Sequence, residues 1–147
     1  MLTFKRGLMI LVVLSVFILA VPLQAATIST IMASDNGGDN GGAVYFDLLV
    51  GSSDILVTSL TTNLYSDQVG TSFTVSIYTT AAGTSYSGNE SNSALWTLVA
   101  TGSGVSAAEN SPSLITLGNT FTLGAGTLQG VALVLGETVG HEYTNGD

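Results

Sequence analysis

The chain of 147 residues contains ten Asp and Glu residues, two basic residues and no Cys. Both basic residues, Lys5 and Arg6, lie at the N-terminus, so the rest of the chain has no Lys or Arg. This excludes the cationic surfaces that bind nucleic acids or anionic lipids, and it leaves no Lys for a Schiff base. Without disulfides, the fold must be held together by an apolar core.

Residues 1–25 have the pattern of a secretory signal peptide. A basic start is followed by the apolar residues 7–21 and by the small residue Ala25. The alternative is an uncleaved membrane anchor, but the apolar run is shorter than the roughly 20 residues that span a bilayer. The sequence therefore predicts cleavage after Ala25. Residues 26–147 are then expected to form one exported domain that does not associate with a membrane.

The first part of the exported chain alternates apolar and polar residues at period two, which is typical of β-strands. The predicted strands cover residues 27–33, 43–50, 55–65 and 72–80. In the third of these the alternation slips by one residue, which predicts a β-bulge at Thr58 and Ser59. The alternative is a pair of short strands separated by a bend.

A long polar connection, residues 81–94, precedes the second group of strands. These are predicted over residues 95–102, 113–117, 120–123, 127–135 and 142–144. Trp96 and Leu98 share one phase of the alternation, and we expect both in the core. The strand over residues 127–135 is nearly all apolar near its end, which predicts a position in the middle of a sheet.

These eight or nine short strands predict an all-β fold. The connections contain no crossover helices, so the sheets are expected to be antiparallel. The spacing of the strands is typical of sandwiches and barrels, and we predict an antiparallel β-sandwich of jelly-roll type. Three phenylalanines, Phe46, Phe73 and Phe121, are expected to face its core.

Several segments resemble a β-sandwich module of bacterial exported proteins that carry a PEP-CTERM sorting tail. They are FDLLVGSSDILVTSLTTNL, FTVSIYTT, the segment around Trp96, LGNTFTLGAGT and EYTNGD. The resemblance implies secretion to the extracellular space or the cell surface of a Gram-negative bacterium, and it implies no catalytic residues. Such modules usually continue past the Tyr-Thr-Asn-Gly segment with further strands and a sorting tail. This chain ends at Asp147, so either it is a fragment or the final strands and the tail are absent, and the domain is then truncated at its C-terminus.

The stretch DNGGDNGG raises the question of a calcium loop. Asp35, Asn36, Asp39 and Asn40 offer four side-chain oxygens, the ligand type that calcium prefers. The EF-hand pattern fails, because Asn40 stands where the loop glycine belongs and no Glu closes the loop. A flexible turn is the alternative, since Asp, Asn and Gly are ordinary turn residues.

Two tyrosines are candidates for carbohydrate binding. Tyr45 and Tyr78 lie out of phase with the inward residues of their strands, so we expect them on an exposed face. Sugar-binding sandwiches often present exposed aromatic rings, which is an argument from fold analogy.

Catalytic residues are not predicted. His141, the only histidine, is expected to be exposed, and no serine lies in a Gly-x-Ser-x-Gly elbow. A glycosidase would need two carboxylates at the right separation, such as a pair from Asp67, Glu90 and Glu109.

The sequence thus predicts a non-enzymatic exported module with a structural role on the cell surface or in the extracellular matrix. The alternative is a module for carbohydrate binding or calcium-dependent adhesion. The expected partners are a surface polysaccharide or other matrix proteins, and calcium is the one cofactor considered.

Overall fold

The computed structural model describes residues 27–29 and 36–143, so the predicted signal peptide and Asp35 lie outside the described residues. The described chain is built almost wholly of β-strands. These are β1 (Asn36–Gly37), β2 (Ala43–Leu49), β3 (Ile55–Val57), β4 (Leu60–Thr62), β5 (Ser72–Thr79), β6 (Thr97–Val105), β7 (Ser113–Leu117), β8 (Phe121–Leu123), β9 (Leu128–Leu135) and β10 (Glu142–Tyr143). Two short 3₁₀ helices, η1 (Ser66–Gln68) and η2 (Ser93–Leu95), lie in the connections. No helix within these residues has the length and apolar character needed to cross a membrane.

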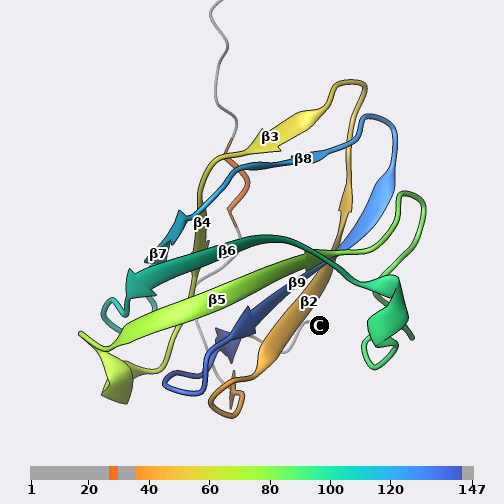
Figure 1. Cartoon of the computed structure of the whole chain (residues 1–147). Coiled ribbons are helices and arrows are strands. Elements are labelled where there is room, and N and C mark those ends of the chain that lie inside the picture. The colour runs from red at the N-terminus through yellow and green to blue at the C-terminus, as the bar shows by residue number, and fades with distance from the viewer. Residues whose placement is uncertain (1–26, 30–35, 144–147) are drawn as a thin grey trace, which may run out of the picture.

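Six strands form one curled antiparallel sheet in the order β2-β9-β5-β6-β7-β4 (Figure 1). The strand β9 pairs with β2 on one side and with β5 on the other, so the predicted central position of this apolar strand is confirmed. Two shorter antiparallel ladders join β3 to β8 and β1 to β10. The predicted all-β antiparallel class is therefore confirmed.

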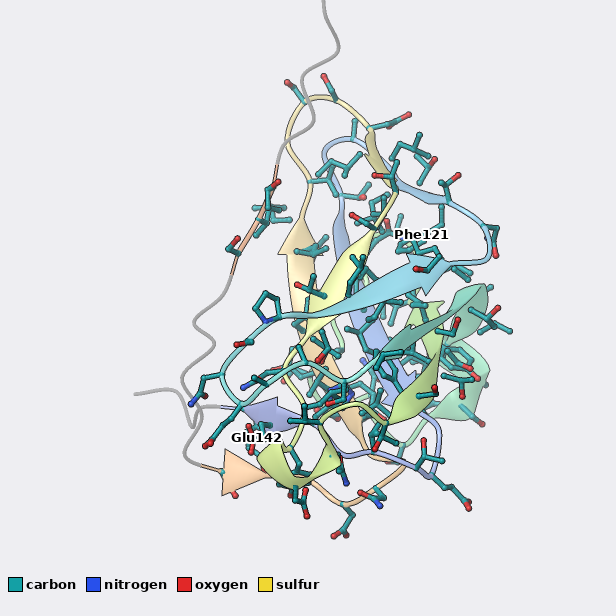
Figure 2. The ribbon with its side chains drawn as sticks, turned by 90° about the vertical axis from the view of Figure 1, so that its left-hand side faces the viewer. Phe121 and Glu142 are labelled. Carbon is teal, nitrogen blue, oxygen red and sulfur yellow. The ribbon has the colours of Figure 1, made fainter. Side chains whose placement is uncertain are left out.

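The core is formed by side chains of the curled sheet together with side chains of the β3–β8 pair. Alternate residues of β5 point inward, and Phe73, Val75 and Ile77 are buried. Strand β8 contributes Phe121 and Leu123 to the same cluster of buried side chains. Figure 2 shows Phe121 among the side chains between the strands, far from Glu142 at the opposite end of the molecule.

Most predicted strands are confirmed, because each has one face on this core. Residues 43–50, 72–80, 113–117, 120–123 and 127–135 all contain a strand within one residue or two of the expected bounds. The first prediction is wrong over its described part: Thr27, Ile28 and Ser29 form no strand, and Ile28 is exposed. The rest of that segment lies outside the described residues.

The predicted β-bulge in the third strand is wrong, and the alternative of two separate short strands holds. The ladder of β3 with β8 ends at Val57, and the ladder of β4 with β7 begins at Leu60, so Thr58 and Ser59 are left out of both. Beyond the break, Leu60, Thr62 and Leu64 take over the inward positions, as the slipped alternation predicts.

The predicted core positions of Trp96 and Leu98 are wrong. Leu98 is 51% exposed and lies opposite Tyr78, while Thr97 lies opposite Thr79, a buried residue of the inner face. Because Thr97 has the inward phase, its neighbours Trp96 and Leu98 point to the outer face, away from the core. The pairing register between β5 and β6 also shifts at Ile77 and Tyr78, which restores the inward phase at Ala100.

The predicted exposure of His141 is also wrong, because its side chain is only 2% exposed. The ring Nε2 lies 3.1 Å from the Leu133 carbonyl oxygen, which can only accept, so Nε2 carries the proton. The Thr62 hydroxyl, 2.9 Å away, then donates to Nδ1. Burial lowers the pKa of His141 to about 4, and the hydrogen bond to Leu133 opposes this shift. A neutral, fully bonded imidazole therefore belongs to the structural interior.

Candidate functional site

Tyr45 and Tyr78 lie on the same outer face of the sheet, the face turned away from the core. Tyr45 of β2 and Tyr78 of β5 are both opposite Ala132 of the central strand β9, one on each side. Ala132 belongs to the outer face but is 2% exposed, which indicates that larger neighbouring side chains cover it. Both tyrosines are half-buried, so they point away from the core but are not fully exposed.

Two further aromatic residues join Tyr45. The ring of Tyr86 lies nearly parallel to that of Tyr45, with an interplanar angle of 16° and a centroid distance of 6.4 Å. The ring of Trp96 lies 5.6 Å from that of Tyr45 at an angle of 58°. We call Tyr45, Tyr86 and Trp96 the aromatic cluster. All three residues are half-buried, so part of the cluster remains open to solvent.

The loop of residues 80–96 brings Tyr86 and Trp96 to this place. Asp47 of β2 holds the loop through two hydrogen bonds: the Ser85 hydroxyl donates to Oδ2 at 2.6 Å, and the Tyr86 backbone N–H donates to Oδ1 at 2.9 Å. Within the loop, the indole N–H of Trp96 donates to the Asn89 carbonyl at 3.0 Å. The Asp47 carboxylate, which has no Lys or Arg partner among the described residues, therefore has the structural task of fixing the aromatic cluster.

Gly130 allows the loop to cross the sheet. It lies opposite Asp47 on the outer face of β9, and its backbone N–H donates to Thr80 Oγ1 at 2.8 Å. A Cβ atom at this position would lie 2.7 Å from the Tyr86 backbone nitrogen and 3.1 Å from the Tyr86 Cα atom. A lone glycine inside an apolar strand often marks such a close approach of another backbone segment.

A shallow hollow of about 480 Å³ continues along the outer face over β5, β6 and β7. Five hydroxyl side chains line it, and we call it the Ser/Thr hollow: Thr74, Ser76, Thr101, Ser103 and Thr116. They face the same side because Thr74 pairs with Ser103, Ser76 with Thr101, and Ser103 with Thr116. Within the described residues, none of these five hydroxyls is hydrogen-bonded to another protein group.

A second hollow, of about 600 Å³, contains two residues of the predicted calcium loop. Asp39 and Asn40 line it together with Gly38, Tyr65, Asp67 and Gln68. Burial raises the pKa of Tyr65, and the nearby carboxylates of Asp39, Glu142 and Asp67 raise it further. The hollow is therefore acidic.

The predicted calcium ligands are only partly brought together there. Asp67 lines the same hollow as Asp39 and adds a second carboxylate there. Asn36, however, lies in strand β1, and Asp35 is outside the described residues. The Asn40 Oδ1 atom accepts a hydrogen bond from Gln68 Nε2 at 2.8 Å. In the part of the chain that the structure describes, no group of three or more His, Cys, Asp and Glu residues is placed to hold a metal ion. This donor set is smaller than the six to eight oxygens that surround calcium in proteins.

The three carboxylates considered for a glycosidase lie in separate segments. Asp67 is part of η1, Glu90 lies in the loop of residues 80–96, and Glu109 lies in the turn between β6 and β7. His141 is buried with both ring nitrogens bonded, so it has no free lone pair at the surface for acid–base chemistry.

The sequence pattern selected Tyr45 and Tyr78 among the aromatic residues, placed Trp96 in the core, and gave no role to Tyr86 or Asp47. Two signals in the sequence point to them: an aromatic residue within a long polar connection, and the isolated Gly130 within an apolar strand. Neither signal by itself says that the connection folds back over β2.

Comparison with known proteins gave no match: no protein-family model matches the chain, and neither a curated protein nor a solved structure does.

Proposed function

We propose that this chain is a non-enzymatic exported module that binds an uncharged carbohydrate on the outer face of its six-stranded sheet. The observation that supports this best is the aromatic cluster, in which Tyr86 and Trp96 lie 6.4 and 5.6 Å from Tyr45. Binding sites for small ligands typically combine apolar and aromatic surface with a few polar groups that fix orientation.

Carbohydrate matches the chemistry of this site. The C–H faces of a pyranose ring pack on aromatic rings, which provide a large apolar surface with little loss of side-chain freedom. The sugar hydroxyls need polar partners beside the rings, and the hydroxyls of the Ser/Thr hollow offer them.

The charge of the chain selects among carbohydrates. Ten acidic residues and no Lys or Arg after Arg6 give an anionic surface, which repels sulfated, phosphorylated and uronic-acid polymers. We therefore expect an uncharged ligand, whose binding changes little with ionic strength because it releases no counterions.

A glycan array tests this proposal. The chain without residues 1–25 is expected to bind uncharged glycans, with binding lost in the variants Tyr45→Ala and Tyr86→Ala. Tyr143→Ala is the matched control, because Tyr143 is an exposed tyrosine on β10, away from the aromatic cluster. An array without any uncharged hit, or hits that survive both cluster variants, would show that the outer face is not the binding site.

Two further inferences concern the arrangement of the β3–β8 pair and the place where the protein works. We infer that the β3–β8 pair is the second layer of a jelly-roll sandwich over the curled sheet. We also infer secretion to the extracellular space or the cell surface, as in the PEP-CTERM proteins that the sequence resembles, where a surface polysaccharide or matrix protein is the natural partner. Detection of the chain in culture medium or on intact cells, with an N-terminus at Ala26, tests the location.

Calcium-dependent adhesion is the second candidate. It is favoured by one observation, the acidic hollow that places Asp39 beside Asp67 from a separate segment. Titration of calcium with a thermal melt is expected to give millimolar affinity and a small rise in melting temperature, since the donor set is incomplete. The variant Asp39→Asn should abolish the rise, whereas Asp54→Asn, at a carboxylate that binds the Ala125 N–H, should keep it. Identical melts with and without calcium would eliminate this candidate.

A further inference from the structure

We propose that the carbohydrate site extends from the aromatic cluster across the Ser/Thr hollow and holds an uncharged, extended polysaccharide chain that runs along β5 and β6. This inference rests on the proposed carbohydrate function and adds the length, direction and shape of the ligand.

The two features are continuous on the outer face. Tyr78 of β5 lies opposite Leu98 of β6, at the end of the strands that carries the aromatic cluster. The next outward pair is Ser76 and Thr101, and the pair after that is Thr74 and Ser103. Residues of one outward phase thus form a path from aromatic and apolar side chains to hydroxyls.

The path ends as it begins, with exposed apolar side chains. Val105 follows Ser103 in the outward phase of β6, opposite Ser72, and is 57% exposed. Leu114 precedes Thr116 in the outward phase of β7 and is also 57% exposed. Aromatic or apolar contacts at both ends, with hydroxyls between them, match a ligand that repeats apolar C–H faces and hydroxyls along its length.

The five hydroxyls of the Ser/Thr hollow are available to bond a ligand. None of the five makes a hydrogen bond within the described part of the protein, although each can donate one and accept two. Four of them are exposed and Ser76 is half-buried. A row of unengaged hydroxyls in a hollow suits a polyhydroxylated chain, since each contact exchanges a bond to water for an equivalent bond to sugar.

The dimensions set the length of the ligand. At about 3.4 Å per residue, the six steps from Tyr78 to Ser72 cover about 20 Å, which corresponds to about four pyranose units in an extended polymer. Strand β5 runs nearly straight over this distance, whereas β6 arches beside it (Figure 1). A straight path favours β-1,4-linked chains, which are extended, over α-1,4-linked chains, which curl.

The test measures binding of soluble cello- and chito-oligosaccharides of two to six units by calorimetry, with malto-oligosaccharides as the curled series. In at least one of the β-linked series the affinity is expected to rise at least tenfold from the dimer to the tetramer and then to level off. The malto series is expected to bind at least tenfold more weakly at equal length.

Variants separate the two parts of the site. Ser76→Ala combined with Thr101→Val removes two central hydroxyls while keeping strand-forming side chains, and is expected to weaken hexamer binding about threefold to tenfold while leaving the dimer unchanged. Thr122→Val, an exposed threonine of β8 outside this face, is the matched control.

Equal affinity for dimers and hexamers, or hollow variants without effect on the hexamer, would overturn the extended site. If neither β-linked series binds while the glycan array gives hits to curled or branched uncharged glycans, the extended site is wrong and the carbohydrate function stands. An array without any hit would contradict both the extended site and the carbohydrate function.

Discussion

His141 has a structural task that its position in the sequence does not suggest. As a buried residue bonded to Thr62 and Leu133, it joins the segment before β10 to the strands β4 and β9. Its neutral form is required, because burial in an apolar surrounding disfavours the charged imidazolium.

Acidification should therefore destabilise the protein through this one residue. The folded-state pKa of about 4 lies below the ordinary histidine value of 6.5, so the unfolded chain binds the additional proton. The contribution to stability is fully present above pH 6.5 and is lost as the pH falls towards 4. Between pH 7 and pH 5 we expect the free energy of unfolding to fall by about 2 kcal/mol, measured by urea denaturation.

The control for this prediction is the variant His141→Gln. It should be less stable at pH 7, because it loses buried hydrogen bonds, but its stability should be flat between pH 7 and pH 5. Since the chain has no other histidine, an unchanged slope in the variant would show that His141 does not cause the effect.

At the scale of elements, the loop of residues 80–96 is the feature that turns a plain sheet face into a candidate site. It is fixed at Asp47 and crosses β9 above Gly130, so the position of the aromatic cluster depends on backbone contacts and not on the aromatic residues alone.

Gly130→Ala should displace this loop. The added Cβ would lie 2.7 Å from the Tyr86 backbone nitrogen, so the loop must move and the hydrogen bond from Tyr86 to Asp47 should weaken. Trp96 is the only tryptophan, and its fluorescence emission is expected to shift to the red as the cluster opens to water.

Gly51→Ala is the matched control for this substitution. Gly51 has open space around the position of a Cβ atom, so its substitution should leave the emission unchanged. Equal spectra for the two variants would mean that Gly130 is not needed for the crossing.

For the whole molecule, stability depends on covering the inner face of the curled sheet. The chain has no disulfide and no Lys or Arg after Arg6, so burial of apolar side chains must supply most of the stabilisation. The pair β3–β8 closes the core through Phe121 and Leu123, both buried.

Phe121→Ala should therefore lower the free energy of unfolding by about 3 to 5 kcal/mol, because it removes buried surface and leaves a cavity. Leu56→Ala on the neighbouring strand β3 removes a side chain that is 56% exposed, and should change stability by less than about 1 kcal/mol. Chemical denaturation of the two variants beside the parent chain measures the difference. Similar losses in both would mean that the β3–β8 pair does not close the core.

Much of the fold could be predicted from the sequence, because a period of two residues directly encodes which side chains share a face of a strand. That local signal was sufficient for β2, β5 and β9, and for the position of the break at Thr58 and Ser59. It was not sufficient for the short strand β1 (Asn36–Gly37), which has no apolar pattern and exists only because β10 pairs with it.

The candidate site could be predicted only in part. The sequence alone determined the all-β class and the lack of Lys and Arg after Arg6. It also determined that Tyr45 and Tyr78 point away from the inward residues of their own strands. The tertiary structure decided which face Trp96 and Leu98 point to, the burial of His141 and the meeting of Tyr86 with Tyr45. Local periodicity indicates that alternate residues of a strand face opposite sides of the sheet. It does not determine which side faces the core or which strand a loop crosses. Those outcomes depend on pairing register and on contacts between segments that are distant in the chain.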